Sequence, residues 1–474
     1  MRRTKIVCTI GPASSSEETL RAMIRAGMDV ARLNFSHGTH ESHAALISAV
    51  RRAAGEEGKV VAILQDLQGP RIRVGEIADG SATLLAGATF VLTTSEVPGS
   101  AESATVHGAP LPQDVKVGDH ILLDDGAIEL QVVETRPTEV VCRVVVGGTL
   151  KPHKGLNGPG RTLSVPSITD KDVEDVVFGI EQRVDYVALS FVRSADDVNR
   201  LREIMAQHGA AIPIMSKIEK HEAVAAFDEI LEASNAIMVA RGDLGIEVPA
   251  EQVPLLQKMI VAKSRAAGKP VVTATQMLDS MIRNPRPTRA EVNDVANAIL
   301  DGTDATMLSG ETAAGLYPVE AVATMARIAE TTDAALPYAS LVRETSATPP
   351  RNTADAIGQA ACEMSFELGA RAIVAFTESG YTARTVAKHR PPCRLVAATP
   401  SETTLRRLAL IWGVEPFLAP ESESTEDMLR NVVGLAVKAG RASQGDLLVI
   451  TAGLPLPASG RTNLLKLHTV GDPL

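Results

Sequence analysis

Charged side chains follow two neighbouring apolar runs of this chain, and their types suit the handling of phosphate. The run MSKIE places Lys217 and Glu219 two residues apart, so on a strand the ammonium group and the carboxylate point the same way. The next run ends ARGD and supplies Asp243. Two carboxylates from neighbouring strands form a minimal Mg²⁺ site, which leaves positions for water and substrate oxygens. Lys217 would then neutralise negative charge while Glu219 and Asp243 hold metal.

Each of these motifs has a simpler interpretation. Lys217 and Glu219 could be a solvated ion pair, and RGDLG could be a plain turn. Their occurrence at the ends of successive strands favours one shared site. Gly242 and Gly245 of RGDLG also let backbone N–H groups approach a carboxylate or phosphate closely.

Two earlier runs, ARLNFSHG and QDLQGPRIRVG, add cations near the same site. A guanidinium group offers a planar fork of donors, so Arg32 and Arg73 are candidates to clamp a transferred phosphoryl group. His37, His40 and His43 lack a nearby set of Cys or carboxylate ligands, so we interpret His37 as a polar contact to ligand instead of a metal ligand. The polar or charged residues of the two runs that we place near the site are Arg32, Asn34, Ser36, His37, Asp66, Arg71 and Arg73.

Hydroxyl and carboxyl groups end the last two apolar runs of the set. Thr275 is expected to bind a substrate carboxylate or to pass a proton, and Ser309 with Glu311 could do the same or only form hydrogen bonds. The sequence has no GxxxxGK[ST] loop and no glycine-rich dinucleotide fingerprint. A nucleotide would therefore be held through metal and cationic side chains.

Eight short apolar runs carry these residues, and nearly every run ends in polar or charged residues. This polarity is typical of a parallel (β/α)8 barrel of the TIM type, whose strand C-termini open into the active site. We therefore expect one site at the mouth of one barrel. The runs are KIVCTI from Lys5, DVARLNFSH from Asp29, VVAILQD from Val60, YVALSF from Tyr186, IPIMSKIE from Ile212, AIMVARGD from Ala236, PVVTATQ from Pro270 and ATMLSGE from Ala305.

The barrel pattern is interrupted once and followed by a different one. Between about Pro70 and Val165, alternating β runs separated by turn residues predict a small antiparallel β-barrel, inserted where it could act as a lid. After Pro349 an α/β pattern resumes and predicts a separate domain with an open sheet, joined through the linker PYASLVRETSATPPRNT. The predicted domains are the catalytic barrel (1–69 and 166–340), the lid (70–165) and a C-terminal α/β domain (350–474).

Composition limits the remaining possibilities. A chain of 474 residues needs more than one hydrophobic core. Its net charge of −10 repels a nucleic-acid backbone. The basic N-terminus is followed by an apolar run that Gly11 and Pro12 break, too short for a signal peptide or membrane span. The four cysteines have no paired spacing, so we expect a cytoplasmic protein with reduced thiols and no nucleic-acid or membrane partner.

The segments VARLNFSHG, MSKIEKHEAV, MVARGDLGIE and ATQMLDSMIRNPRPTRAEVNDVANAILDGTDATMLSGETA closely resemble the pyruvate kinase family, and the resemblance extends over nearly the whole chain. It implies phosphoryl transfer from phosphoenolpyruvate to ADP, with Mg²⁺, or Mn²⁺ in its place, held by Glu219 and Asp243. Lys217 would stabilise the transferred charge, and the Gly242 and Asp243 amides with Thr275 would grip the substrate carboxylate. The residues that would contact phosphates or nucleotide are Arg32, Arg73, Asn34, Ser36, His37 and Lys154.

One position departs from the pattern of many members of this family. They read DTKGPEIR at the third barrel strand, where the Glu helps to bind a required K⁺ ion, whereas this chain reads DLQGPRIR with Arg71 in that place. A tethered guanidinium could replace the free cation, so we expect activity without K⁺. Alternatively, Arg71 only faces solvent. The potential K⁺ ligands that remain are Asn34, Ser36, Asp66 and Leu67.

Resemblance also implies regulation and assembly. TESGYTA and PASGRTN could cradle the phosphate of an allosteric effector, or could simply cap their loops. NPRPTRAE resembles a subunit contact and implies a homotetramer.

Two alternative functions fit the sequence less well. A phosphohistidine-dependent dikinase would need a mobile nucleophilic His, and a non-catalytic phosphate sensor would not need Lys217, Glu219 and Asp243. The enolate could be protonated by Thr275, by Ser309 with Glu311, or by a metal-bound water. The expected effector residues are Thr377, Ser379, Thr382, Gly460 and Arg461.

Overall fold

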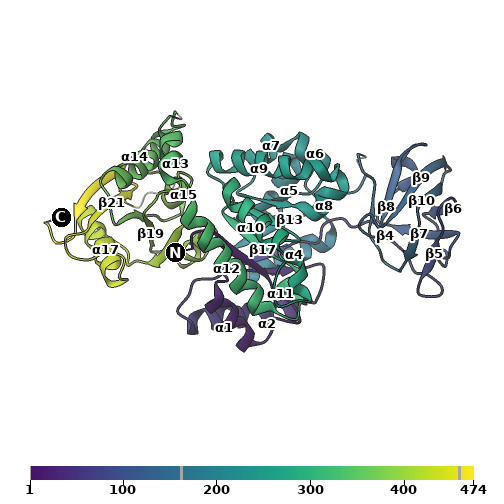
Figure 1. Cartoon of the computed structure of the whole chain (residues 1–474), viewed down its shortest axis with the longest axis horizontal. Helices are drawn as coiled ribbons and strands as arrows, with labels where there is room; N and C mark the ends of the chain where they lie inside the picture. Colours follow the sequence, from purple (N-terminus) through teal and green to yellow (C-terminus); the bar gives the residue numbers. More distant parts are fainter. Residues whose placement is uncertain (1, 161–163, 348, 457–460, 474) are drawn as a thin grey trace.

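The structure is a computed structural model that describes residues 2–160, 164–347, 349–456 and 461–473. Three parts follow one another along the long axis of the molecule (Figure 1). A barrel lies in the middle, an inserted β region lies at one end, and an α/β region lies at the other.

Eight parallel strands form a closed barrel, as the apolar runs predict. Every strand pairs in parallel with both neighbours, in the order β1-β17-β16-β15-β14-β13-β3-β2. Their nearly continuous Val, Ile, Leu and Ala composition suits strands covered on both faces. The strands are β1 Lys5–Thr9, β2 Val30–Asn34, β3 Ala62–Asp66, β13 Tyr186–Leu189, β14 Ile214–Ile218, β15 Ala236–Ala240, β16 Val271–Ala274 and β17 Ala305–Leu308.

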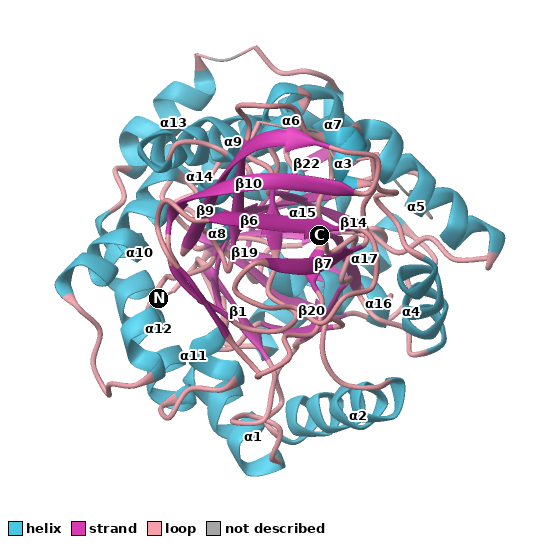
Figure 2. Cartoon of the chain, turned by 90° about the vertical axis from the view of Figure 1, so that its right-hand side faces the viewer, coloured by secondary structure: helices cyan, strands magenta, loops and turns pink. Residues whose placement is uncertain are grey.

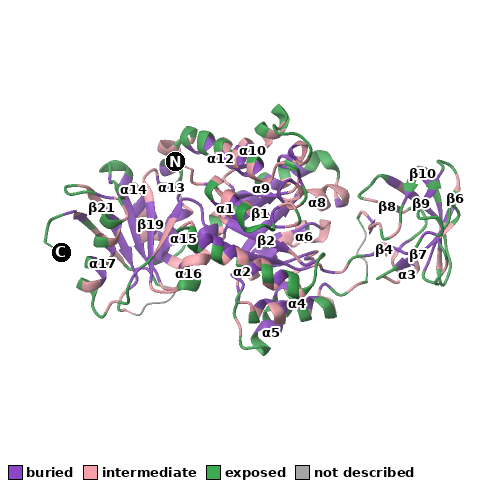
Figure 3. Cartoon of the chain, turned by 90° about the horizontal axis from the view of Figure 1, so that it is seen from below, coloured by how far each residue is buried: buried purple, intermediate pink, exposed green. Residues whose placement is uncertain are grey.

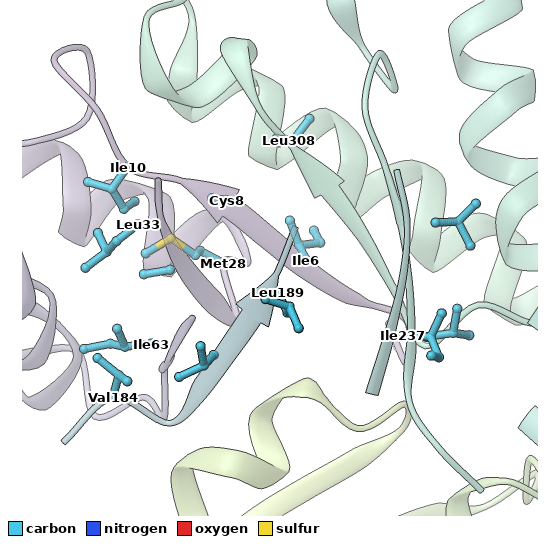
Figure 4. Packing of buried hydrophobic residues seen from close by; sticks show 14 of the residues in the cluster. Ile6, Cys8, Ile10, Met28, Leu33, Ile63, Val184, Leu189, Ile237 and Leu308 are labelled. Carbon is cyan, nitrogen blue, oxygen red and sulfur yellow. The ribbon is translucent and has the colours of Figure 1, made fainter. Parts of the chain in front are cut away.

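Side chains alternate along each barrel strand between two separate cores. Ile6 and Cys8 of β1 point outward into the layer between strands and helices, together with Leu33 and Ile63 (Figure 4). Val7 belongs instead to the cluster inside the barrel. The outer layer buries the apolar faces of the surrounding helices, whose exposed faces form the surface (Figure 3).

Helices surround the barrel as a ring when the molecule is viewed along its long axis (Figure 2). Local signals define several of their ends: α1 begins after the N-cap Ser16, whose side chain accepts from the Thr19 N–H, and ends at Gly27 with φ 129°. The helices are α1 Glu17–Ala26, α2 His40–Glu56, α4 Asp170–Glu181, α5 Ala195–Gln207, α6 His221–Ala225, α7 Phe227–Ala233, α8 Arg241–Glu247, α9 Val253–Ala267, α10 Arg289–Asp301, α11 Gly310–Ala313 and α12 Pro318–Ala335, with 3₁₀ turns η1 Ala250–Gln252 and η2 Asp279–Ile282.

The inserted region between β3 and β13 is a nearly closed sheet with its own apolar core. Seven strands follow the order β12-β8-β9-β10-β6-β7-β4, and a bridge between Arg73 and Gly155 brings the two edges together. The prediction of an all-antiparallel barrel is wrong in one pair, because β6 and β7 are parallel. Its elements are β4 Arg73–Val74, β5 Ala82–Leu84, β6 Thr89–Thr93, β7 Ser103–His107, α3 Leu111–Asp114, β8 His120–Leu123, β9 Ile128–Thr135, β10 Glu139–Val146, β11 Gly148–Leu150 and β12 Leu156–Asn157.

The C-terminal region is an open five-stranded sheet with helices, ordered β20-β19-β18-β21-β22. Among the strands that the structure describes here, β22 pairs antiparallel with β21 and the others pair in parallel. The segment expected to be a linker contains helix α13, and the edge strand β20 was not predicted. The elements are α13 Tyr338–Ser346, α14 Thr353–Glu367, β18 Ala372–Phe376, α15 Tyr381–Ala387, β19 Arg394–Thr399, α16 Glu402–Arg407, η3 Leu408–Leu410, β20 Val414–Leu418, α17 Thr425–Lys438, β21 Leu447–Ala452 and β22 Leu464–Thr469.

The C-terminal region closes the N-terminal end of the barrel. Ala409 and Leu410 of η3 belong to the same buried cluster as the inward side chains of the barrel strands. The guanidinium of Arg3, just before β1, lies over the rings of Tyr338 and Trp412, at 4.5 and 5.4 Å from their centroids. The opposite, C-terminal end of the barrel faces the inserted sheet (Figure 1).

Within the described residues, none of the helices combines the length and the apolar character that crossing a membrane requires.

Candidate active site

Two cations and two carboxylates form one network at the C-terminal ends of the barrel strands. Lys217 Nζ lies 2.8 Å from Glu219 Oε1 and 3.4 Å from Asp66 Oδ1. It also donates to Ser190 Oγ at 2.8 Å. Arg32 Nε binds Asp66 Oδ2 at 2.6 Å. Side chains from β2, β3 and β14 and from the ends of β13 and β14 thus meet where the sequence predicts the site.

Burial and neighbouring charges act against each other at three groups of this network, and together they set the direction in which each pKa shifts. Burial tends to raise the pKa of Asp66, but Lys217 and Arg32 hold this pKa below its usual value. Burial tends to lower the pKa of Lys217, but Asp66 and Glu219 raise it above its usual value. For Glu219, burial together with the charge of Asp243 raises the pKa in spite of Lys217. The raised pKa keeps Lys217 an ammonium group at neutral pH. A further cation beside Glu219 would favour the charged form of this carboxyl group.

Glu219 and Asp243 fit a divalent metal. The Glu219 side chain is fully buried, and its Oε2 accepts the Phe191 N–H at 2.7 Å. Its Oε1 accepts no hydrogen bond of regular geometry from the described residues, although Lys217 Nζ lies beside it. Asp243, at the start of α8, is half-buried and lines the adjoining cleft. Carboxylate oxygens of this kind are the ligands that Mg²⁺ prefers.

The turn after β16 holds Thr275 against the start of α8. Thr275 Oγ1 accepts the Gly242 N–H at 2.8 Å and donates to the Ala274 carbonyl at 2.6 Å. Thr275 and Gln276 have φ values of 71° and 53°, an unusual conformation for residues other than glycine. Such strain is typical of functional turns. Gly242 and Thr275 are therefore in contact, as a shared carboxylate site requires.

A cleft of about 330 Å³ opens between the barrel mouth and the inserted sheet. Arg71 and Arg73 face it, and neither guanidinium has a carboxylate within 4 Å among the described residues. Burial and the nearby charge of Arg71 lower the pKa of Arg73. Lys154 pairs with Asp124 at 2.7 Å, a contact that raises the pKa of Lys154. The predicted residues that line the cleft are His37, Arg71, Arg73, Lys154 and Asp243.

The residues expected around a monovalent cation come from two separate segments, and of these residues Arg71 lines the cleft whereas Asn34, Ser36, Asp66 and Leu67 do not. Asn34 Oδ1 accepts the Ser36 N–H at 3.1 Å. Leu67 is buried, and its carbonyl accepts the Ser190 hydroxyl at 2.7 Å. Asp66 is already paired with two cations. Arg71 does not contact Asp66 in this structure.

Several site residues were missed by the sequence analysis. Ser190 links Lys217 to the Leu67 carbonyl, and Thr9 Oγ1 accepts from Arg32 at 2.8 Å. Lys220 binds Glu247 at 2.6 Å beside the cleft. Ser190 directly follows the apolar residues of the run YVALSF, so the rule that polar residues end barrel strands could have found it.

Ser309 and Glu311 take part in hydrogen bonds that connect two loops. Glu311 Oε1 accepts the Leu278 N–H at 3.0 Å, and its Oε2 accepts the Ser309 N–H at 2.7 Å. Burial raises the pKa of Glu311 against these hydrogen bonds. Glu311 therefore joins the loop after β16 to the loop after β17.

The expected effector residues lie in the C-terminal region. Thr382 and Thr462 are buried, and their hydroxyl oxygens lie 2.8 Å apart. This contact joins α15 to the segment before β22. Thr377 is buried, while Ser379 and Arg461 are exposed. Gly460 lies outside the described residues.

Cations gathered with carboxylates at the C-terminal mouth of a (β/α)8 barrel, below an inserted sheet, are typical of barrel enzymes that act on phosphorylated substrates. Comparison with known sequences is more specific. Residues 1–322 match the family described as "Pyruvate kinase, barrel domain", and residues 355–468 match "Pyruvate kinase, alpha/beta domain". The chain belongs to the pyruvate kinase family.

Individual relatives match this chain along its whole sequence. The chain is 50% identical to the pyruvate kinases of Staphylococcus aureus strains MRSA252 and USA300, over 476 aligned residues that cover 100% of this chain and 81% of each relative. A crystal structure of a pyruvate kinase from Cryptosporidium parvum superposes with a TM-score of 0.93 at 39% identity, covering 99% of this chain and 96% of that one. The chain is thus a phosphotransferase with pyruvate kinase activity.

Proposed function

We propose that this enzyme transfers a phosphoryl group from phosphoenolpyruvate to ADP with a requirement for Mg²⁺ held by Glu219 and Asp243. The observation that carries this proposal is the network of Lys217, Glu219, Asp66 and Arg32 at the barrel mouth. A bound Mg²⁺ would supply a Lewis acid beside the phosphate oxygens. The fully buried Glu219 side chain supports this assignment.

The side chains of the network suit a loose phosphoryl-transfer transition state, which needs positioned cations more than a nucleophile. Lys217 is held by Ser190 and Asp66, so its ammonium group is oriented before substrate arrives. Arg32 is held in the same way by Asp66 and Thr9. Thr275 and the Gly242 amide are placed to bind the substrate carboxylate, which would exchange their mutual hydrogen bond for contacts to its oxygens.

ADP is proposed to enter the cleft between barrel and inserted sheet, on the side of Arg73, His37 and Lys154. Unpaired guanidinium groups suit phosphate oxygens in such a place. Asn34 and Ser36 lie just before His37 and would support the nucleotide side of the site. Closure of the inserted sheet over the mouth would exclude water, which would otherwise accept the phosphoryl group.

Activity is proposed to be independent of K⁺. Arg71 brings a permanent positive charge to the cleft. Asp66, one of the potential K⁺ ligands, is already neutralised by Arg32 and Lys217. A free monovalent cation therefore has less negative charge to balance.

A phosphorylated effector is proposed to bind the loops that carry Thr377, Ser379, Thr382 and Arg461. Support comes from the contact of Thr382 with Thr462, which draws two hydroxyl-bearing segments together. Thr382→Glu would place a carboxylate there and is expected to abolish activation by sugar phosphates and nucleotides while basal activity remains. Unchanged activation in a rate assay across such a panel would remove the site from these loops.

The catalytic proposal is tested with Lys217→Met in an assay that couples pyruvate formation to NADH oxidation, with Mg²⁺, phosphoenolpyruvate and ADP present. Loss of the ammonium group is expected to lower kcat about 10³-fold, as for removal of a main charge stabiliser. The control is Lys263→Met, because Lys263 pairs with Asp228 on the exposed barrel surface. A Lys217→Met enzyme with near-normal kcat would contradict the proposed role.

A further inference from the structure

A second cleft lies between the barrel and the C-terminal region, away from the barrel mouth. It encloses about 300 Å³, a volume within the range of small-molecule sites. The barrel contributes the end of α7 and the loop after α9, while the C-terminal region contributes the start of α14 and helix α15. We call it the interdomain cleft and define it by its cationic residues, which are Arg202, Lys269, Arg351, Arg384 and Lys388.

Positive charge in the interdomain cleft is largely uncompensated. The cleft has five cationic residues and two carboxylates, Glu232 and Asp355. Asp355 is already occupied, because it pairs with Lys388 at 2.5 Å and with His389 at 3.0 Å. This excess is unexpected in a chain whose net charge is −10.

Within the described part of the chain, four of the five cations have no carboxylate partner within 4 Å. Arg351 and Arg384 have no carboxylate within 4 Å of their guanidinium groups among residues 2–160, 164–347, 349–456 and 461–473. Lys269 Nζ donates to the carbonyls of Leu231 and Glu232, at 2.5 and 2.7 Å. Arg202 likewise bonds the Asn199 side chain at 2.6 Å and the Ala233 carbonyl.

These cations also oppose one another. Burial lowers the pKa of Lys269 to about 8, and the charges of Arg202 and Arg384 add to the effect while Glu232 opposes it. Lys269 belongs to the barrel and Arg384 to the C-terminal region, so the repulsion acts across the boundary. An anion between them would convert repulsion into attraction on both sides.

We propose that the interdomain cleft binds a small phosphorylated anion of at least two negative charges, which bridges the barrel and the C-terminal region. Guanidinium groups without partners are the donors that phosphate oxygens prefer. The site shares no lining residue with the active-site cleft, and the expected effector residues Thr377, Ser379, Thr382 and Arg461 do not line it. The inference stands independently of the residue roles proposed for catalysis.

Calorimetric titration of the intact enzyme with pyrophosphate, at constant ionic strength, tests this site. The informative variant is Arg351→Gln with Arg384→Gln. Each lost charge-assisted hydrogen bond is expected to weaken binding about tenfold or more. The matched control is Arg200→Gln with Arg430→Gln, which removes the same charge from exposed arginines paired with Glu203 and Asp427.

Three outcomes decide the proposal. A pyrophosphate site lost in the Arg351/Arg384 variant and kept in the control supports it, provided basal kcat shows that the variant is folded. If the double variant does not fold, Arg351→Gln alone, at an exposed position, gives the same comparison. Equal affinity and stoichiometry for pyrophosphate in the wild type, the Arg351/Arg384 variant and the control would overturn the proposal. It would also be overturned if sulfate and chloride, at matched ionic strength, weakened pyrophosphate binding to the same extent.

Further titrations identify the kind of phosphate that binds and distinguish the interdomain cleft from the active site and the effector loops. Titration with a sugar monophosphate in parallel distinguishes an organic phosphate from inorganic pyrophosphate. Lys217→Met and Thr382→Glu are each expected to keep the interdomain affinity, because neither residue lines this cleft. Loss of the affinity in either variant would assign the binding to the active site or the effector loops and overturn the proposal.

Discussion

At the scale of single residues, the site depends on cations and carboxylates that are paired with one another before any ligand binds. Lys217 would be costly to bury alone, and its neighbours Asp66 and Glu219 raise its pKa. Asp66 serves two cations at once. The Asp66 carboxylate therefore orients both Arg32 and Lys217. Because these two cations already neutralise it, a further cation bound there would be stabilised less.

Position 71 tests this balance directly. The unmodified enzyme is expected to turn over with tetramethylammonium as the only monovalent cation. Arg71→Glu reverses the charge and is expected to lose about 100-fold in kcat under these conditions, then to recover when K⁺ is added. Rates are measured with each chloride salt at equal ionic strength.

The neutral variant Arg71→Gln is the control for position 71, because it removes the positive charge without adding a negative one. Wild-type activity that collapses in tetramethylammonium and returns with K⁺ would end the proposal of K⁺ independence. If the rates of the wild type and of both variants are the same in tetramethylammonium and in K⁺, Arg71 only faces solvent.

At the scale of elements, helices α14 and α15 are joined by a buried charged cluster. His389, just after α15, lies 3.0 Å from Asp355 of α14, which also binds Lys388. Burial and the adjacent Lys388 lower the pKa of His389 to about 4. The histidine is therefore neutral in the folded protein over a pH range where the unfolded chain binds a proton.

This difference predicts acid sensitivity with a defined sign. Between pH 6.5 and about 4 the unfolded state holds the extra proton, so stability falls as the pH falls, by at most about 3 kcal/mol. His389→Gln keeps a neutral donor and is expected to flatten the fall of Tm across this range. The measurement is Tm by circular dichroism from pH 4 to 8.

The control for His389 is His208→Gln, at an exposed histidine that ends α5. It should leave the slope of Tm against pH unchanged. Parallel curves for wild type and His389→Gln would show that the acid sensitivity arises elsewhere.

Elements also show how far sequence reasoning reaches. The eight barrel strands were predictable because burial on both faces leaves apolar runs with polar ends. The edge strand β20 was missed because VEPFL is short and contains Pro416, which is tolerated only where no ladder hydrogen bond is needed. Helix α13 was missed because its polar sequence is stabilised by packing, with Val342 buried and Tyr338 under Arg3.

The site was predictable in part for a related reason. Lysine and carboxylates at strand ends have distinctive chemistry, so Lys217, Glu219 and Asp243 stand out. Ser190 does not, because a serine becomes informative only when its hydroxyl is seen against Lys217. Contacts between segments far apart in sequence, such as Thr382 with Thr462, carry no local pattern at all.

At the scale of the whole molecule, the barrel is covered at both ends, and apolar side chains remain exposed on its flank. Leu316 is 72% exposed, and its N–H donates to the Ile282 carbonyl at 2.9 Å, next to the segment NPRPTRAE. The exposed Leu316 beside this segment is a candidate contact residue for the homotetramer that the resemblance implies.

Light scattering after size exclusion tests the assembly. The wild type is expected at four times the chain mass of 50.0 kDa. Leu316→Asp removes apolar contact and adds charge, so the dissociation constant should rise more than tenfold and smaller species should appear. Leu85→Asp, at a leucine 68% exposed in the inserted sheet, is the matched control and should remain tetrameric. A wild-type monomer would refute the assembly.

The clasp of Arg3 between Tyr338 and Trp412 has a consequence for how the molecule is made. Strand β1 leaves the ribosome before the other barrel strands, yet its partner strand β17 ends at Leu308, and the rings that contact Arg3 are synthesised later still. One edge of β1 therefore has no partner strand until β17 has been synthesised. The barrel strand that is synthesised first is thus among the last to gain all of its contacts.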